Sequence, residues 1–206
     1  MSATRVNKMR LLELFSGTES IGKVFKNNGW EVVSVDNNPI HKPTYCADMI
    51  DFVIDGSFDV IWASPPCTAF SVASIGRHWK QGKPSPEAKF GTKLLLKTFE
   101  IIMLIRPKFW FIENPRGMMR VLPVMDLLPK KTVTYCQYGD ERMKPTDIWT
   151  NCDKWNARPP CKNGDPCHIS APRGSTTGTQ GLNLIDRARL PNELCVEIFE
   201  TVKGLL

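Results

Sequence analysis

Residues 11–36, LLELFSGTESIGKVFKNNGWEVVSVD, hold the pattern that decides the fold. The apolar run LLELF predicts a short buried strand, and the small polar residues and glycine of SGTES predict a tight turn after it. IGKVFKNNG places its apolar residues on one helical face, and Asn28-Gly29 ends that helix because glycine takes the left-handed conformation at low cost. EVVSVD then predicts a second strand that ends in an acid. Strand, glycine turn, helix, strand and acid form the first half of a doubly wound nucleotide-binding unit, in which the acid can reach a ribose.

The same alternation continues toward the middle of the chain. FDVIWAS at 58–64 and FWFIENP at 109–115 predict two further buried strands. Between them, apolar residues recur at helical spacing from about residue 87 and stop at Arg106-Pro107, because proline cannot continue a helix. The repeated order of strand and helix indicates an α/β fold with a mainly parallel sheet.

The last third of the chain changes in character. TVTYCQY at 132–138 alternates like a strand, whereas residues 150–186 are rich in proline, glycine and cysteine and show no clean period. The final segment predicts an amphipathic helix from near Pro191 to near Gly204. We therefore expect a catalytic, cofactor-binding domain at 1–149, a short irregular insert at 150–186, and a C-terminal helix at 187–206 that packs back on the catalytic domain.

Composition and charge narrow the class of protein. Hydrophobic residues make up 42% and charged residues 23% of the 206 residues, which excludes disordered, collagen-like and coiled-coil chains. The formal net charge of +6 and the pI near 9.0 favour a polyanionic partner such as nucleic acid. The sequence has no apolar run long enough for a membrane helix, and MSATRVNKMR lacks the apolar core of a signal peptide. We expect a cytoplasmic protein without a membrane partner.

Two short motifs end two of the predicted strands. Pro65-Pro66-Cys67 follows the strand at 58–64, and Glu113 opens Glu-Asn-Pro at the end of the strand at 109–115. Two prolines fix successive backbone angles and so hold the thiol in a defined place, as a nucleophile requires. By itself Cys67 is better interpreted as a buried structural cysteine, and Glu113 alone is equally well interpreted as a surface acid. Because open α/β sheets place their sites at the carboxyl ends of strands, the two motifs together indicate a catalytic pair.

In this order the motifs resemble those of the DNA (cytosine-5)-methyltransferases. LFSGTESIG is similar to the family's cofactor loop, SPPC is its nucleophile motif, and ENP is close to its Glu-Asn-Val motif. TYCQYGDER falls where the family has a Gln-x-Arg-x-Arg motif. The resemblance covers most of the chain and implies a Rossmann-like fold that binds S-adenosylmethionine.

The resemblance also assigns the cofactor site. It implies that Asp36 accepts the ribose hydroxyls and that Asp48 contacts the adenine. The family's last motif is recast as LPNEL, which contributes Asn192. The residues that the resemblance assigns to the cofactor are Phe15, Ser16, Gly17, Thr18, Glu19, Ser20, Asp36, Asn37, Asp48, Pro65 and Asn192.

The reaction implied by the resemblance has separate roles for the two motifs. The thiolate of Cys67 adds to carbon 6 of cytosine while Glu113 binds and protonates ring nitrogen 3, and the activated carbon 5 takes the methyl group. A base then removes the proton from carbon 5, and Cys67 is eliminated. Arg142 is expected near the cytosine, where it would neutralise charge. The partner is double-stranded DNA with the target cytosine flipped out, and the loop at 71–86 is expected to close over it.

The region at 150–186 lies where the family has its target-recognition region. So short a region contacts few bases, so the target sequence is short, the specificity is relaxed, or a partner subunit supplies it. Arg173 and the hydroxyl and amide side chains of 174–180 offer donors to phosphates and base edges, and Trp149 and Trp155 offer stacking surfaces. The alternative is a polar surface loop with packed tryptophans.

Seven cysteines are an odd number, and the expected reducing compartment argues against a disulfide framework. Cys152, Cys161, Cys167 and His168 crowd one proline-rich segment and form a candidate structural zinc site. Their spacing contains no Cys-x-x-Cys pair, so reduced cysteines in a loop remain the alternative.

Other functions stay open at this stage. The same nucleophile could act on RNA, on a nucleotide, or with a cofactor that carries a group other than methyl. A catalytically silent, zinc-stabilised nucleic-acid-binding module is a further alternative, although such a module needs neither Cys67 nor Glu113. By analogy, the small size suggests a phage enzyme, acting in a bacterial host's cytoplasm and linked to restriction-modification.

Overall fold

A seven-stranded sheet forms the centre of the computed structural model, which describes residues 8–170 and 182–206. The strand order is β3-β2-β1-β4-β7-β9-β8. All neighbouring strands pair in parallel except at β9, which is antiparallel to both β7 and β8. The strands are β1 (Arg10–Leu14), β2 (Glu31–Asp36), β3 (Tyr45–Cys46), β4 (Val60–Ala63), β7 (Phe109–Pro115), β8 (Lys130–Val133) and β9 (Thr146–Thr150).

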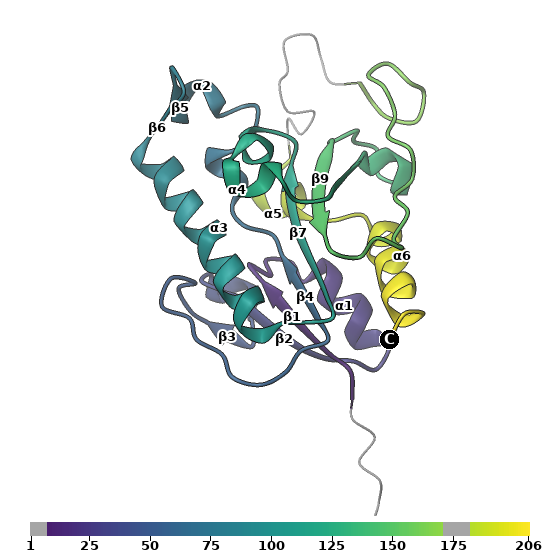
Figure 1. The fold of residues 1–206 in the computed structure, drawn as a ribbon. Coiled ribbons are helices and arrows are strands. Elements are labelled where there is room, and N and C mark those ends of the chain that lie inside the picture. The colour runs from purple at the N-terminus through teal and green to yellow at the C-terminus, as the bar shows by residue number, and fades with distance from the viewer. Residues whose placement is uncertain (1–7, 171–181) are drawn as a thin grey trace, which may run out of the picture.

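Helices cover both faces of this sheet (Figure 1). On one face α1 packs beside α6, and on the other lies the long α3, next to α4. The helices are α1 (Ser20–Asn27), α2 (Ile75–His78), α3 (Pro86–Ile105), α4 (Pro123–Asp126), α5 (Leu184–Ala188) and α6 (Asn192–Lys203). Short 3₁₀ turns complete the chain: η1 (Pro39–His41), η2 (Cys67–Ala69), η3 (Met118–Val121) and η4 (Tyr135–Tyr138).

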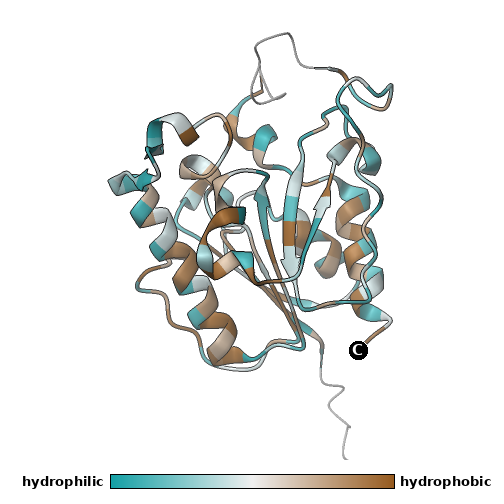
Figure 2. Cartoon of the chain, turned by 45° about the horizontal axis from the view of Figure 1, so that its top comes forward, coloured by the Kyte–Doolittle hydropathy of each residue, from teal (hydrophilic) through white to brown (hydrophobic). Residues whose placement is uncertain are grey.

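Alternation along the strands divides the core into two layers. Leu11 faces the layer of α1 and α6, whereas Leu12 and Leu14 face the layer of α3. In β4, Trp62 and Ile61 divide in the same way. Both faces of the strands are therefore apolar, as expected for a sheet covered on both sides, and hydrophobic residues run along the central strands in Figure 2.

The α/β fold predicted from the sequence is confirmed, and several elements agree closely with their expected bounds. β2 and β7 occupy the predicted residues, and α3 and α6 begin and end within one residue of those expected. The expected loop at 71–86 is partly ordered as α2 and a hairpin of β5 (Trp79–Lys80) and β6 (Lys83–Pro84). Trp79 ties this hairpin to η2, because its indole N–H donates to the carbonyl of Ala69 at 2.7 Å.

The sequence analysis was wrong at two places near β9. The strand expected at 132–138 ends at Val133, and the chain turns into η4. It also missed β9, in which every residue is buried, and which crosses the expected domain boundary at 149/150. A carboxylate inside this strand is stable because Asp147 accepts from Arg120 Nε at 2.8 Å and from Thr132 Oγ1 at 2.7 Å.

Trp149 and Trp155 do not form a stacking surface for bases. Both side chains are fully buried in the two core layers. The indole of Trp155 donates to Glu197 of α6 at 3.0 Å, so this part of the insert packs against the final helix. The expected DNA contacts of Arg173 and residues 174–180 lie outside the described residues.

Within residues 8–170 and 182–206, no helix combines the length and the apolarity that a membrane span requires.

A buried carboxyl links β1 to the start of α1. Glu13, 2% exposed, accepts from the backbone N–H of Gly22 at 3.1 Å. A Cβ at position 22 would lie 2.3 Å from Glu13 Oε2, so any larger residue here would displace the buried carboxyl group. Burial, together with the nearby Glu19, raises the pKa of Glu13 from 4.5 to about 8.

We expect Glu13→Gln to increase the free energy of unfolding near pH 8 by on the order of 2–3 kcal/mol. As the pH rises from 4.5 toward 8, the unfolded chain loses a proton that the folded chain keeps, so the wild-type protein loses stability through this window. Glutamine has no proton to lose. Urea unfolding at about pH 4.5, 6 and 8 measures the effect, and an unchanged pH dependence in the variant would contradict it.

Candidate active site

The Pro-Pro-Cys segment turns the chain sharply at the carboxyl end of β4. Ser64 N–H still pairs with the carbonyl of Leu14 at 3.2 Å, and the two prolines then direct the backbone into η2, which begins at Cys67. The next residues anchor η2, since Phe70 is fully buried. The Cys67 side chain is exposed, so the thiol stands free on a fixed turn.

A side-chain hydrogen bond joins this turn to the neighbouring strand. Asn114, in β7 and fully buried, donates its amide N–H to the carbonyl of Pro65 at 2.7 Å. A second link follows, because Met118 N–H donates to the carbonyl of Phe70 at 2.6 Å. A Cβ at Gly117 would lie 2.1 Å from that same carbonyl oxygen, so glycine permits the close approach. The Glu-Asn-Pro strand end therefore sets the position of the Pro-Pro-Cys turn.

Glu113 lies in β7 directly before this asparagine and is 6% exposed. Tyr135 donates its hydroxyl to Glu113 Oε1 at 3.4 Å. Burial raises the pKa of Glu113 above its usual value, and the positive charge of Lys144 partly opposes that rise. The carboxyl is therefore suited to hold a proton and to donate it to a bound base.

The surroundings of Cys67 also change its acidity. Crowding by protein atoms raises the pKa of the thiol, and the negative charge of Glu113 raises it further. Lys144 and Arg187 act in the opposite direction. The thiol and the carboxyl are thus electrostatically coupled. Ionised Glu113 favours the neutral thiol of Cys67, and protonated Glu113 favours the thiolate.

A pocket opens at the same sheet edge, beside the turn that carries Cys67. Its walls combine two acids and an asparagine with apolar side chains from the start of α3. The lining residues are Phe15, Asp36, Asn37, Ala47, Asp48, Met49, Ser64, Pro66, Phe90 and Leu94. Phe15, Asp36, Asn37 and Asp48 are among the residues expected to bind the cofactor, whereas Pro66 lines the pocket in place of the expected Pro65.

Comparison with known proteins agrees with this arrangement. Residues 9–121 match the protein family described as C-5 cytosine-specific DNA methylase. The chain belongs to this DNA methylase family. The probable DNA (cytosine-5)-methyltransferase of Frog virus 3 (isolate Goorha) is 32% identical over 218 residues, which covers 93% of this chain and 99% of the viral protein.

Solved structures show the same fold. The methyltransferase EhMeth of Entamoeba histolytica superposes with a TM-score of 0.51 at 14% identity, covering 70% of this chain and 52% of that one. Spodoptera frugiperda DNMT2 superposes with a TM-score of 0.50 at 17% identity, covering 73% and 53%. This member of the DNA methylase family spans about half the length of these two structures.

The loop between β1 and α1 holds most of the other residues expected to bind the cofactor of this DNA methylase. Gly17 N–H donates to Asp36 Oδ2 at 2.9 Å, which fixes the acid against the loop. Phe15 has a φ of 55°, a strained value that directs its ring to the pocket wall. Ser16 Oγ is buried without a hydrogen-bond partner among the described residues.

Three expected cofactor residues face other partners. Thr18 and Ser20 share a hydrogen bond at 2.9 Å between their hydroxyls, and Glu19 pairs with Lys26 at 2.9 Å. Asn192 is the exposed first residue of α6 and is not among the residues that line the pocket.

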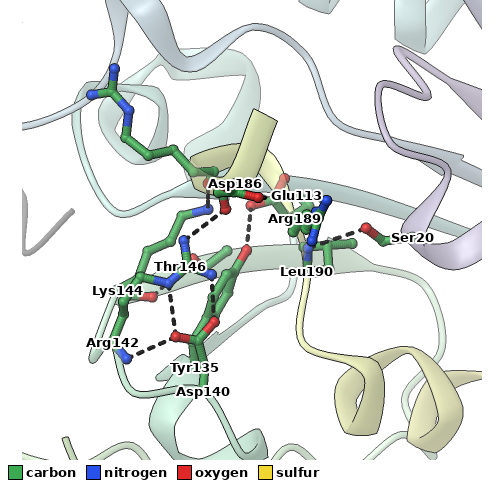
Figure 3. A network of polar contacts seen from close by, with 11 residues as sticks. Ser20, Glu113, Tyr135, Asp140, Arg142, Lys144, Thr146, Asp186, Arg189 and Leu190 are labelled. Atoms are coloured by element: carbon green, nitrogen blue, oxygen red, sulfur yellow. Dashed lines mark hydrogen bonds and ion pairs between the residues drawn. The ribbon is translucent and has the colours of Figure 1, made fainter. Parts of the chain in front are cut away.

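Lys144, two residues beyond the expected Arg142, is a cation whose charge acts on both Cys67 and Glu113. Arg142 is held by Asp140, with Nε to Oδ1 at 2.8 Å, and its Nη1 donates to the carbonyl of Asp186 in α5 (Figure 3). Lys144 donates to the carbonyl of Arg187 at 2.6 Å, and its charge partly opposes the rise in the pKa of both Cys67 and Glu113. The sequence analysis missed it, although a second cation two residues beyond Arg142 was a usable signal.

We expect Lys144→Met to decrease the rate of methyl transfer by roughly 10- to 100-fold, because the thiolate of Cys67 loses a nearby positive charge. The same loss raises the pKa of the thiol, so its alkylation by iodoacetamide should need a higher pH. Lys144→Arg keeps the charge and should recover most of both properties. A Met variant with unchanged alkylation would contradict the electrostatic role.

The expected zinc ligands are corrected at one position. Cys152 is fully buried in the core beside Trp155, so it cannot meet the other cysteines. Cys136, in η4, lies with Cys161 and Cys167 instead. The spacing of the cysteines in the sequence could not show that η4, which lies outside the insert, brings Cys136 next to it.

Proposed function

We propose that the protein transfers a methyl group from S-adenosylmethionine to carbon 5 of a cytosine flipped out of double-stranded DNA. The observation that carries the proposal is the coupling of an exposed thiol to a buried carboxyl. Asn114 ties their two strand ends together through Pro65 at 2.7 Å. Family membership supplies the substrate class, DNA, and the kind of cofactor.

The residues around the pocket fit the cofactor. A nucleoside needs a carboxylate for its ribose hydroxyls and apolar walls for its base, and Asp36 and Phe15 offer these groups. The unpartnered hydroxyl of Ser16 is one further polar group that a ligand can satisfy. When bound, S-adenosylmethionine would supply an electrophilic methyl group.

The protein's own groups would then act in sequence on the base. Glu113 gives its proton to ring nitrogen 3, which makes carbon 6 electrophilic, and the thiolate of Cys67 forms a bond to carbon 6. The electron pair of the ring's 5,6 double bond would shift to carbon 5, and a bound cofactor would supply the methyl group there and leave as a neutral thioether. A base would then take the proton from carbon 5, the proton on ring nitrogen 3 would return to Glu113, and the Cys67 sulfur would leave carbon 6 with its bonding electrons, which restores the ring. Extraction of the base costs a few kcal/mol, which contacts to the protein must offset.

The test is covalent trapping in the presence of S-adenosylmethionine on duplex DNA that contains 5-fluorocytosine in place of cytosine. Fluorine cannot leave as a proton does, so the reaction should stop as a protein–DNA adduct that survives denaturing electrophoresis. Peptide mapping by mass spectrometry should place the attachment on Cys67. Cys46→Ser, which removes another exposed thiol, is the matched control and should still form the adduct.

Parallel reactions with single-stranded DNA, RNA and free nucleotide identify the substrate. An adduct on RNA alone would transfer the proposal from DNA to RNA, and no adduct on any substrate would overturn it. Three expectations stay predictions: that a partner subunit supplies the specificity, that the enzyme comes from a phage, and that it takes part in restriction-modification.

A further inference from the structure

Four side chains from two separate segments meet at the outer side of η4. The ligand atoms of Cys136, Cys161, Cys167 and His168 all lie within 4.8 Å of one another. Cys136 comes from η4, and the other three come from the insert, 25 or more residues later in the chain. This grouping is separate from the pocket and from the catalytic pair.

The distances from His168 to two of the sulfurs match a tetrahedral metal site. His168 Nδ1 lies 3.7 Å from the sulfur of Cys161 and 3.6 Å from that of Cys167. Zinc bonds of about 2.3 Å to sulfur and about 2.0 Å to nitrogen place such atoms about 3.6 Å apart in a tetrahedron. The sulfur of Cys136 lies 3.5 Å from that of Cys167 and 3.1 Å from that of Cys161. These distances are far above the roughly 2.05 Å of a disulfide.

The segment that carries three of the ligands has little else to hold it. None of the residues from 159 to 170 is buried. Cys161 N–H donates to Thr134 Oγ1 at 3.0 Å and Ile169 N–H to the carbonyl of Glu141 at 2.9 Å, and both contacts only fasten its two ends. A short irregular segment without a core commonly requires a metal to fix its conformation.

One further contact agrees with a bound metal. Gln137 donates its side-chain amide to the sulfur of Cys167 at 3.4 Å, which is the kind of outer hydrogen bond that orients a thiolate ligand. His168 directs Nδ1 to the sulfurs, while its Nε2 is buried without a partner among the described residues. Nδ1 is therefore the imidazole nitrogen that would bind the metal.

We propose that Cys136, Cys161, Cys167 and His168 bind one structural zinc ion that fastens the insert to the catalytic domain through η4. Three sulfurs and one imidazole nitrogen favour zinc, and four protein ligands leave no open position for a reacting water. The neighbour of Cys136 in η4 is Tyr135, which contacts Glu113. The ion thus holds the insert in a fixed place relative to the active site.

The experiment measures zinc in protein purified under reducing conditions without chelators. We expect about one zinc per chain by mass spectrometry of the metal content. Cys167→Ala changes an exposed residue and should reduce the zinc content at least about 10-fold without loss of the fold. Cys136→Ala should do the same. Cys152→Ala and Cys46→Ser are the matched controls, because both should retain zinc.

Two other measurements keep the inference open to contradiction. Replacement of the metal by cobalt(II) should give the strong visible absorption of a tetrahedral thiolate site in the wild-type protein and lose it in Cys167→Ala. Hydrogen exchange should increase in residues 159–170 after chelation, while β1 and β4 stay protected. Zinc-free wild-type protein, a Cys136–Cys161 disulfide, or unchanged zinc in Cys167→Ala would overturn the proposal. None of these results depends on methyl transfer.

Discussion

Cys67→Ala is expected to abolish methyl transfer, with a loss of at least about 10⁴-fold, because no other group can form the covalent bond to carbon 6. The side chain is exposed at the start of η2, so its removal leaves no cavity in the core. The free energy of unfolding should therefore change by less than about 1 kcal/mol. Methyl incorporation into duplex DNA and urea unfolding measure the two effects.

A control distinguishes loss of the nucleophile from loss of the fold or of binding. Cys67→Ala should still bind the duplex and the cofactor, because neither the residues that line the pocket nor the net positive charge of the chain is changed. Residual methylation above about 1% of the wild-type rate would show that the reaction proceeds without the thiol. Equal loss in Cys46→Ser would point to a general effect of thiol removal.

The parts of the fold that the sequence predicted are those with strong local signals. β2 and β7 are apolar runs with clear ends, and α3 has a helical period that stops before a proline. β9 has no such signal, because its buried Asp147 is stable through Arg120 and Thr132, which are both distant in the sequence. Long-range pairing of a buried polar group cannot be read from local pattern.

The candidate site likewise contains residues that the sequence predicted and residues that it did not. Cys67 and Glu113 were predicted together because parallel strands end at the same edge of a sheet. Lys144 was not predicted, because its effect on the pKa of Cys67 and Glu113 depends on how the turn before β9 approaches β7. Cys136 was missed for a related reason: it enters the cysteine cluster only because η4 replaces the expected strand at 132–138.

Glu113→Gln is expected to decrease methyl transfer by roughly 10³-fold or more, because glutamine cannot give a proton to ring nitrogen 3. The free energy of unfolding should instead increase. The raised pKa means that the folded chain keeps a proton which the unfolded chain loses as the pH rises above about 4.5. Above that pH the wild-type protein loses stability and the variant does not, so the variant should be the more stable protein near pH 8.

The reactivity of the thiol gives the sharpest check on this pair. Ionised Glu113 raises the pKa of Cys67, so a neutral glutamine lowers it. At a pH where wild-type Glu113 is ionised, iodoacetamide should therefore alkylate Cys67 several-fold faster in Glu113→Gln than in the wild-type protein. Methyl transfer should fall while the nucleophile becomes more reactive. Because unfolding would also expose the thiol and lower its pKa, urea unfolding must show in parallel that the variant is folded at the pH of the assay. Parallel losses of both would instead mean that Glu113 only holds the site in shape.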